Sequence, residues 1–119
     1  MATLTIRVDL DESSAIGPGK ARLLELIGET GSIRRAAAAM KMSYRRAWLL
    51  VQEIEAVMGA AVVTTETGGK QGGGARLTPL GRSVVSRYRA IEKRAARSVA
   101  AELRAMSSMA KRAPKREAR

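Results

Sequence analysis

Residues 31–59, which read GSIRRAAAAMKMSYRRAWLLVQEIEAVMG, decide the fold of this 119-residue chain. Ser32 is a typical N-cap for a helix over about Ile33–Met40, whose apolar side chains fall on one face. Ser43 is a second N-cap candidate, and from there to Met58 apolar residues again recur at helical spacing. Two helices joined by such a short turn predict a helix-turn-helix, whose second helix fits the major groove of DNA.

The residues before this motif predict one strand and one helix. Thr3–Leu10 alternates polar and apolar residues, which is the period of a half-buried strand. The polar stretch Asp11–Gly19 contains Gly-Pro-Gly and predicts a connection. A helix is expected over Lys20–Thr30, with Gly31 placed to end it in a left-handed conformation.

The residues after the motif predict a hairpin and a long helix. Ala61–Thr65 favours a strand, and Ala75–Leu77 is its expected partner across the glycine-rich tip Glu66–Gly74. Thr78-Pro79 places an N-cap before a proline and opens a helix to about Met109. One continuous apolar stripe follows this helix, formed by Val84, Tyr88, Ile91, Ala95, Val99, Leu103 and Met106. The predicted fold class is mainly α with a small β component, a winged helix-turn-helix with a long C-terminal dimerisation helix.

The charge of the chain points to a polyanionic partner. Lys and Arg number 22 against 11 Asp and Glu, a net charge of +11. Residues 1–31 carry 3 − 5 = −2, so residues 32–119 carry 19 − 6 = +13. Nucleic acid is favoured over a membrane surface, because no strongly amphipathic basic helix dominates the chain.

The absence of Cys and His excludes much of enzyme chemistry. Disulfides, thiolate or imidazole zinc sites and Cys or Ser/His nucleophile pairs cannot form, so we expect no enzyme, no cofactor and no metal. The longest apolar run, Ala56–Val63, is too short to cross a bilayer, and Met1–Leu4 does not begin an export signal. A cytoplasmic location without a membrane partner is therefore expected.

The start of the second motif helix holds the candidate base readers. Helical geometry turns Tyr44, Arg45, Trp48 and Leu49 outward, while Arg46 can reach the DNA backbone or a base. Arg can bond guanine with two hydrogen bonds. The alternative is that Arg45 and Arg46 are simply solvated at the start of a helix. Two cations at a helix N-terminus, however, oppose the helix dipole. Trp48 is expected to pack against a neighbouring helix or the wing, or else to contact DNA.

Two other clusters have weaker functional interpretations. Lys70 is followed by Gln71 rather than Ser or Thr, so the glycine-rich tip is not a nucleotide-binding loop. It is better interpreted as a wing lying against phosphate or the minor groove, with a plain flexible loop as the alternative. Asp9, Asp11 and Glu12 are expected to form a solvated turn rather than a metal or acid-base site.

These residues resemble a known family. Ser43-Tyr44, Ala47-Trp48 and above all residues 67–75, TGGKQGGGA, resemble the N-terminal DNA-binding domain of the molybdate-responsive ModE regulators. The helix-turn-helix part is shared more loosely with LysR-type regulators. The resemblance covers roughly residues 18–95 and implies a homodimer that binds double-stranded DNA at palindromic operators. A separate oxyanion-sensing partner then supplies the regulatory input, or no such input exists.

The expected sites follow from these arguments. The residues expected to contact DNA are Ser32, Arg34, Ser43, Tyr44, Arg45, Arg46, Trp48, Lys70, Gln71 and Arg76. The residues expected at the dimer interface are Leu4, Ile6, Val8, Val84, Tyr88, Ile91, Ala95, Val99 and Leu103. Residues 1–110 are expected to form the DNA-binding and dimerisation domain, and residues 111–119 a basic, disordered tail.

The resemblance thus implies a sequence-specific DNA-binding transcriptional regulator, with molybdenum-related genes as the expected targets. Two rival functions remain open beside it. An architectural or nucleoid-type protein would use the same charge to bind nucleic acid without sequence preference. A carrier of oxyanions would use the amides of the glycine-rich loop together with Lys70. A regulator distinguishes one DNA sequence from another, whereas an architectural protein does not. An oxyanion carrier is required to bind molybdate stoichiometrically.

Overall fold

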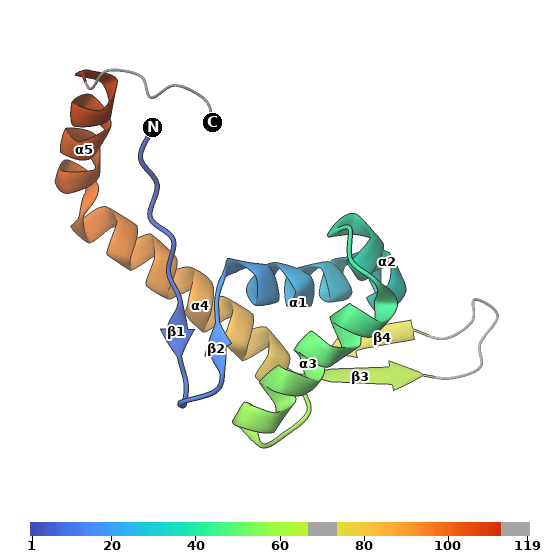
Figure 1. Cartoon of the computed structure of the whole chain (residues 1–119). Helices are drawn as coiled ribbons and strands as arrows, with labels where there is room; N and C mark the ends of the chain where they lie inside the picture. Colours follow the sequence, from blue (N-terminus) through green and yellow to red (C-terminus); the bar gives the residue numbers. More distant parts are fainter. Residues whose placement is uncertain (67–73, 113–119) are drawn as a thin grey trace.

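The computed structural model describes residues 1–66 and 74–112. The elements in chain order are β1 Val8–Asp9, β2 Ala15–Ile16, α1 Pro18–Thr30, α2 Ile33–Ala39, α3 Tyr44–Met58, β3 Val63–Glu66, β4 Gly74–Leu77, α4 Pro79–Ser98 and α5 Ala100–Arg112. The strands form two separate antiparallel pairs, β1 with β2 and β3 with β4 (Figure 1). The fold is a mainly helical winged helix-turn-helix, as the sequence predicts. Among the described helices, none has the length and apolar character needed to span a membrane.

Helices α1, α2 and α3 enclose the core, because each turns an apolar face toward the others. The largest fully buried side chains are Leu23, Leu24, Ile27, Val51, Ile54 and Val62. Ala36, Ala37 and Ala47 are also buried, and these small side chains let α2 and α3 approach closely. The helix-turn-helix is thereby fixed against α1.

The predicted caps of the motif are present. The Ser32 hydroxyl accepts a hydrogen bond from the Arg35 amide at 3.0 Å, and the Ser43 hydroxyl accepts one from the Arg46 amide at 3.0 Å. Gly31 ends α1 in the left-handed region at φ 70°. The turn between α2 and α3 places Lys41 in that region at φ 58°, which is uncommon for a residue with a side chain.

The wing is a hairpin tied to both α3 and α4. Strands β3 and β4 pair from Val63 opposite Leu77 to Glu66 opposite Gly74. The first strand begins two residues later than expected because other groups hold Val62: its amide donates to Glu55 and its carbonyl accepts from the Thr78 amide. These bonds join the start of the wing to α3 and to the residue that caps α4.

The N-terminal segment does not form the predicted strand over residues 3–10. Only Val8–Asp9 pairs, because its partner β2 is cut short where Pro18 begins α1. Proline suits a first helical position, since its missing amide has no partner there, so α1 starts two residues before the expected Lys20. The earlier residues lie along the C-terminal helices instead: Tyr88 donates its hydroxyl proton to the Ile6 carbonyl at 2.6 Å. Burial raises the pKa of this phenol.

The long C-terminal helix is broken into two. Val99 has φ −116° and ψ 17°, which ends α4, and α5 turns away from its axis (Figure 1). The Ser98 hydroxyl donates to the Ala95 carbonyl at 2.8 Å, a side-chain contact that competes with the helix amide and bends helices. The apolar spacing continues across the break, so the pattern alone predicted one helix. Helix α5 runs to Arg112, past the predicted end at Met109, so the first two residues assigned to a tail are helical.

An ion pair joins α4 to α1. Arg89 donates to both carboxylate oxygens of Glu25, at 3.0 and 2.8 Å, and also to Glu92 at 2.7 Å. The contact with Arg89 lowers the pKa of Glu25.

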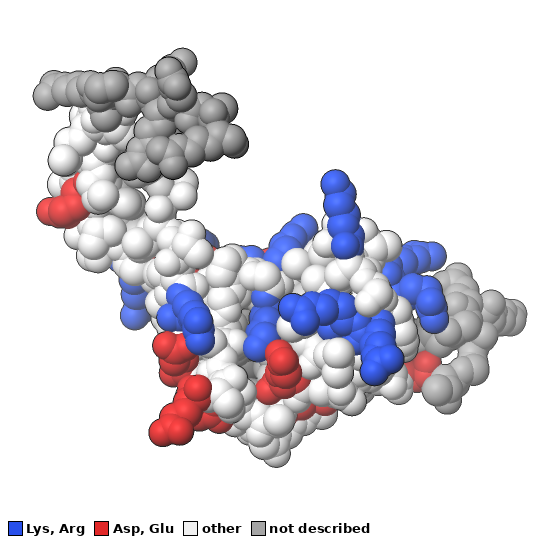
Figure 2. All heavy atoms as spheres, viewed as in Figure 1, with Lys and Arg blue, Asp and Glu red and all other residues white. Residues whose placement is uncertain are grey.

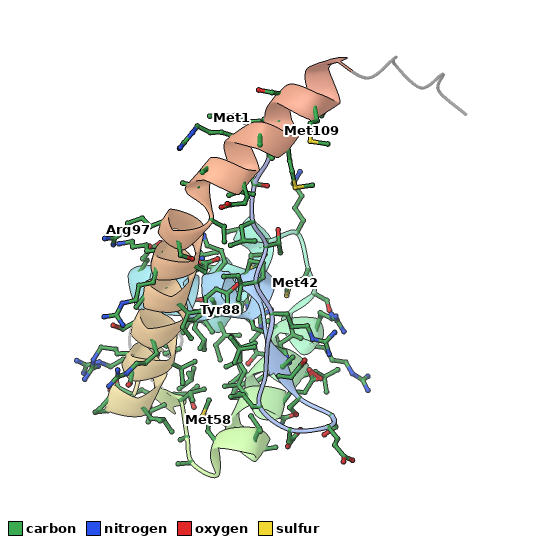
Figure 3. The ribbon with its side chains drawn as sticks, turned by 90° about the vertical axis from the view of Figure 1, so that its left-hand side faces the viewer. Met1, Met42, Met58, Tyr88, Arg97 and Met109 are labelled. Atoms are coloured by element: carbon green, nitrogen blue, oxygen red, sulfur yellow. The ribbon has the colours of Figure 1, made fainter. Side chains whose placement is uncertain are left out.

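At the far end of the molecule the Ala2 amide donates to the Ser107 hydroxyl at 2.6 Å, so Met1 and Met109 lie at the same end (Figure 3).

Candidate nucleic-acid interface

The outer face of α3 is the centre of the candidate interface. Ala47, Val51 and Ile54 turn inward and are buried. The opposite side of the helix exposes Arg45, Leu49 and Gln52, which recur at the spacing of one helical face, and Arg46 is exposed beside them. One side of α3 is thus buried, and the other side presents cationic, apolar and amide groups to solvent.

The start of α3 is organised by three side chains from both motif helices. The Arg34 guanidinium of α2 lies 4.6 Å from the centre of the Tyr44 ring. The Trp48 ring meets Tyr44 edge-on, with ring centres 6.4 Å apart, and its indole N–H donates to the Tyr44 hydroxyl at 2.5 Å. Arg34, Tyr44 and Trp48, called the Tyr44 cluster below, are brought together. The cluster holds the first turn of α3 in a defined geometry relative to α2.

Cations surround this cluster. Arg35, Lys41, Arg45 and Arg46 are exposed around it, and Arg34 is exposed within it. Figure 2 shows Lys and Arg side chains gathered over the part of the molecule that contains α2 and α3. The ion pairs between described residues engage other cations, namely Arg7, Lys20, Arg22 and Arg89. The cations around the motif are therefore available to an external anion.

Four exposed residues of this surface are missing from the expected DNA contacts: Arg35, Lys41, Leu49 and Gln52. The outward direction of Leu49 was predicted, and the same helical spacing could have found Gln52, which lies seven residues after Arg45. Lys41 could not be placed in the same way, because its exposure depends on the left-handed turn.

The wing contributes Arg76, which is exposed on β4. A surface hollow lies between this strand and the end of α1, lined by Gly28, Glu29, Thr30, Gly31, Ala75, Arg76, Leu77 and Arg82. Arg82 donates to the Leu77 carbonyl at 3.0 Å at its edge. The predicted wing contacts Lys70 and Gln71 lie outside the described residues.

The acidic residues near the N-terminus serve the hairpin turn. One carboxylate oxygen of Asp11 accepts from the amides of Ser13 and Ser14, at 2.9 and 2.7 Å, and these bonds lower the Asp11 pKa. Arg7 pairs with Asp9 at 2.8 Å. Over the described part of the chain, no group of three or more Asp and Glu side chains is placed to hold a metal ion.

The residues expected at a dimer interface divide into three groups by exposure. Val84 and Tyr88 are only 7% and 3% exposed, so they belong to the core of one chain and cannot form the main contact with another. Ile91 and Leu4 are 42% and 40% exposed. Ile6, Val8, Ala95, Val99 and Leu103 are partly buried.

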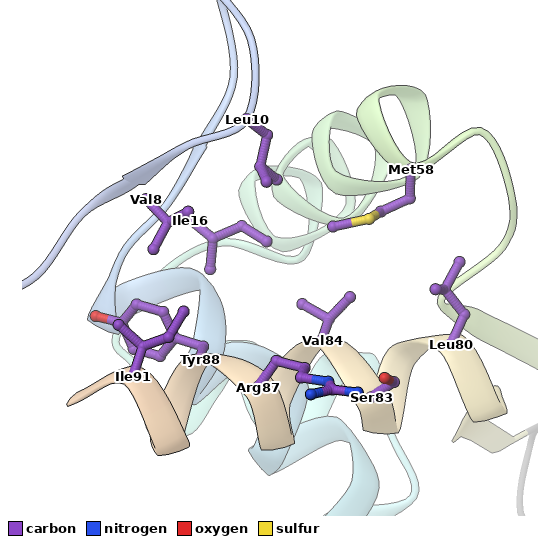
Figure 4. Close-up of a pocket in the computed structure, with 10 residues that line it drawn as sticks. All are labelled: Val8, Leu10, Ile16, Met58, Leu80, Ser83, Val84, Arg87, Tyr88 and Ile91. Atoms are coloured by element: carbon purple, nitrogen blue, oxygen red, sulfur yellow. The ribbon is translucent and has the colours of Figure 1, made fainter. Parts of the chain in front are cut away.

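An apolar groove of about 250 Å³ lies beside the N-terminal half of α4. Val8, Leu10 and Ile16 of the hairpin and Met58 of α3 face Leu80 and Val84 across it (Figure 4). Ser83, Arg87, Tyr88 and Ile91 complete the lining. The groove joins the exposed part of the α4 stripe at Ile91.

Comparison with known proteins places this arrangement among bacterial regulators. The chain is 40% identical over 85 residues to the molybdenum transport protein ModE of Azotobacter vinelandii, covering 71% of this chain and 32% of that protein. It is 47% identical over 77 residues to the molybdenum-pterin-binding protein MopB of Rhodobacter capsulatus, covering 65% and 28%. The DNA-binding transcriptional dual regulator ModE of Escherichia coli strain K12 is 32% identical over 87 residues, covering 73% and 33%. The chain thus spans about a third of the length of these curated relatives.

Solved structures share the fold. The DNA-binding domain of CbnR in complex with DNA superposes with a TM-score of 0.56 at 24% identity, covering 75% of this chain and 95% of that one. Full-length CbnR with its target DNA gives 0.54 at 21% identity, covering 71% and 27%. A family model described as bacterial regulatory helix-turn-helix protein, lysR family, matches residues 19–82. The chain therefore belongs to the lysR family of bacterial regulatory helix-turn-helix proteins.

Proposed function

We propose that this chain binds double-stranded DNA in a sequence-specific manner and regulates transcription, with α3 in the major groove. The observation that carries the proposal is the outer face of α3, where exposed Arg45, Leu49 and Gln52 stand opposite the buried side of the helix. Arg pairs with guanine and Gln with adenine in the major groove, so this face carries the side chains that distinguish bases. Several relatives are named as ModE regulators, and the structural neighbours were solved with DNA.

The flanking cations position the protein on the duplex. Arg34, Arg35 and Lys41 lie at the edge of the motif, and Arg76 lies on the wing. Contacts with phosphate fix register and orientation but carry no sequence information. Ser32 and Ser43 use their hydroxyl oxygens to cap helices, which leaves each hydroxyl proton to donate to phosphate. The tail residues 113–119, outside the described chain, and Lys70 and Gln71 are proposed as further backbone contacts.

A second copy of the chain is the proposed partner at the other end of the molecule. The apolar spacing on α4 and α5 is nearly symmetric about Ala95: Ile91 and Val99 lie four residues to either side, and Val84 and Met106 lie eleven. A two-fold axis through Ala95 pairs each such residue with its counterpart in an antiparallel arrangement.

Charge supports the same register. The antiparallel pairing about Ala95 brings Glu102 of the second copy beside Arg87 at the rim of the apolar groove. Both residues are exposed, and their charges are opposite. The partner's Met106, which is 61% exposed in one chain, then covers the groove at Val84. Each copy covers the groove of the other, which removes both apolar surfaces from water.

The names of the relatives suggest the regulated genes. Molybdenum appears in the names of two of the proteins reported above, so we propose that the regulated genes serve molybdenum handling. The proposed site of action is the cytoplasm. A separate oxyanion-sensing partner is the proposed source of the regulatory signal. No catalytic step is part of this function.

Two substitutions test base reading against backbone contact. Arg45→Ala should reduce the preference for the operator over single-base variants by about 10-fold, because one bidentate pair discriminates by ~1–3 kcal/mol. Arg76→Ala should weaken binding to all sequences alike and lower the slope of log K against log salt by about one. Titration of labelled duplexes at several salt concentrations measures both. An unchanged preference in Arg45→Ala contradicts a base-reading role for that residue.

A further inference from the structure

An exposed leucine, Leu49, lies at the centre of the α3 outer face, outside the hydrophobic core of this chain. Leu49 is 46% exposed and lies between Arg45 and Gln52 along the face. The buried side of α3 is filled by Ala47, Val51 and Ile54, which lie on the opposite side of the helix. The exposed part of Leu49 contributes nothing to the core, and contact with a partner would remove that apolar area from water.

The neighbouring indole is also limited to apolar contact. Trp48 has one polar donor, its ring N–H, and this group already donates to the Tyr44 hydroxyl. Its partly exposed ring therefore presents carbon to the outside. Tyr44 is itself held by Arg34 at 4.6 Å, which fixes the orientation of the pair. Trp48 and Leu49 thus add two separate apolar groups to a cationic face, because consecutive residues of a helix point in different directions.

In the major groove, only one feature of a base pair is apolar: the C5 methyl group of thymine. We infer that Leu49 recognises a thymine methyl group in each half-site of the bound DNA. The inference rests on the proposed function, and it names one base that this surface selects. Arg45 and Gln52 on either side then read the adjacent base pairs through hydrogen bonds.

The test removes the methyl group alone. Thymines of the preferred duplex are replaced one at a time by deoxyuridine, which keeps every hydrogen-bonding group. Wild-type protein should lose about 4-fold in affinity at one thymine of a half-site, since one buried methyl group corresponds to roughly that factor. With Leu49→Ala the same replacement should have no effect. Gln52→Ala is the matched control, because it alters the same exposed face and should keep the 4-fold loss.

Each outcome decides the inference. It is overturned if no thymine replacement weakens the wild type, or if Leu49→Ala remains as sensitive as the wild type at that thymine. Neither result would affect the proposed function, provided that the wild type still prefers one sequence. If the proposed function fails, the wild-type protein binds all duplexes with equal affinity, which is a different result. Since Leu49 is exposed, circular dichroism of Leu49→Ala should match the wild type and exclude a folding defect.

Discussion

At the scale of single residues, Ser43 combines two tasks that substitution can separate. Its hydroxyl caps α3 by accepting from the Arg46 amide, and it stands where phosphate would approach the helix. Ser43→Ala should lower the free energy of unfolding by about 1 kcal/mol. Ser43→Asp keeps the cap and suits the helix dipole, so stability should be retained while the added charge weakens DNA binding at every sequence.

Thermal unfolding and DNA titration of both Ser43 variants measure these effects. Tight DNA binding by Ser43→Asp, at the level of the wild type, would contradict a phosphate beside this residue. Both caps and the outward direction of Tyr44 and Arg45 could be predicted from the sequence, because local hydrogen bonding and helical spacing fix them. The Tyr44 cluster could not, since its Arg34 comes from a different helix and its geometry depends on the packing of α2 against α3.

At the scale of elements, Gly81 sets how closely α4 approaches the wing. A Cβ at this position would overlap the Val62 carbonyl, and backbone cannot yield as a flexible side chain can. Gly81→Ala should therefore lower the free energy of unfolding by roughly 1–3 kcal/mol, the usual cost of overpacking. Gly19→Ala is the control, because nothing lies within 4 Å of its added Cβ. Chemical denaturation compares the two, and equal stability of both variants would show that α4 can shift from Val62.

The elements also show where sequence periodicity reaches its limit. The alternation over residues 3–10 correctly marks an extended segment at its end, but pairing needs a partner strand, and β2 ends where α1 begins. The stripe on α4 and α5 is continuous in spacing, whereas the break at Val99 depends on the Ser98 hydroxyl contact with Ala95. Both differences arise from contacts outside the repeating pattern.

At the scale of the whole molecule, the symmetric stripe predicts how two copies meet. The chain contains no cysteine, so Ala95→Cys introduces one thiol at the proposed two-fold axis. Two such thiols in facing, closely packed helices can meet the Cα separation of ~4.4–6.8 Å that a disulfide requires. Oxidation should therefore produce a covalent dimer, detected by non-reducing electrophoresis.

Lys93→Cys is the control for this cross-link, because it is exposed on the other side of α4. A dimer that forms equally well with both variants would reflect random collision. Absence of cross-linking with Ala95→Cys, in a protein that sediments as a dimer, would place the two-fold axis elsewhere.

The central claim is that this molecule distinguishes DNA sequences, and selection from a randomised duplex pool at physiological salt tests it most directly. The account predicts an enriched palindrome whose half-sites lie about one helical turn apart, ~34 Å, as two recognition helices related by a two-fold axis require. Retention of DNA without any enriched motif would contradict it and identify a protein that binds the phosphate backbone alone.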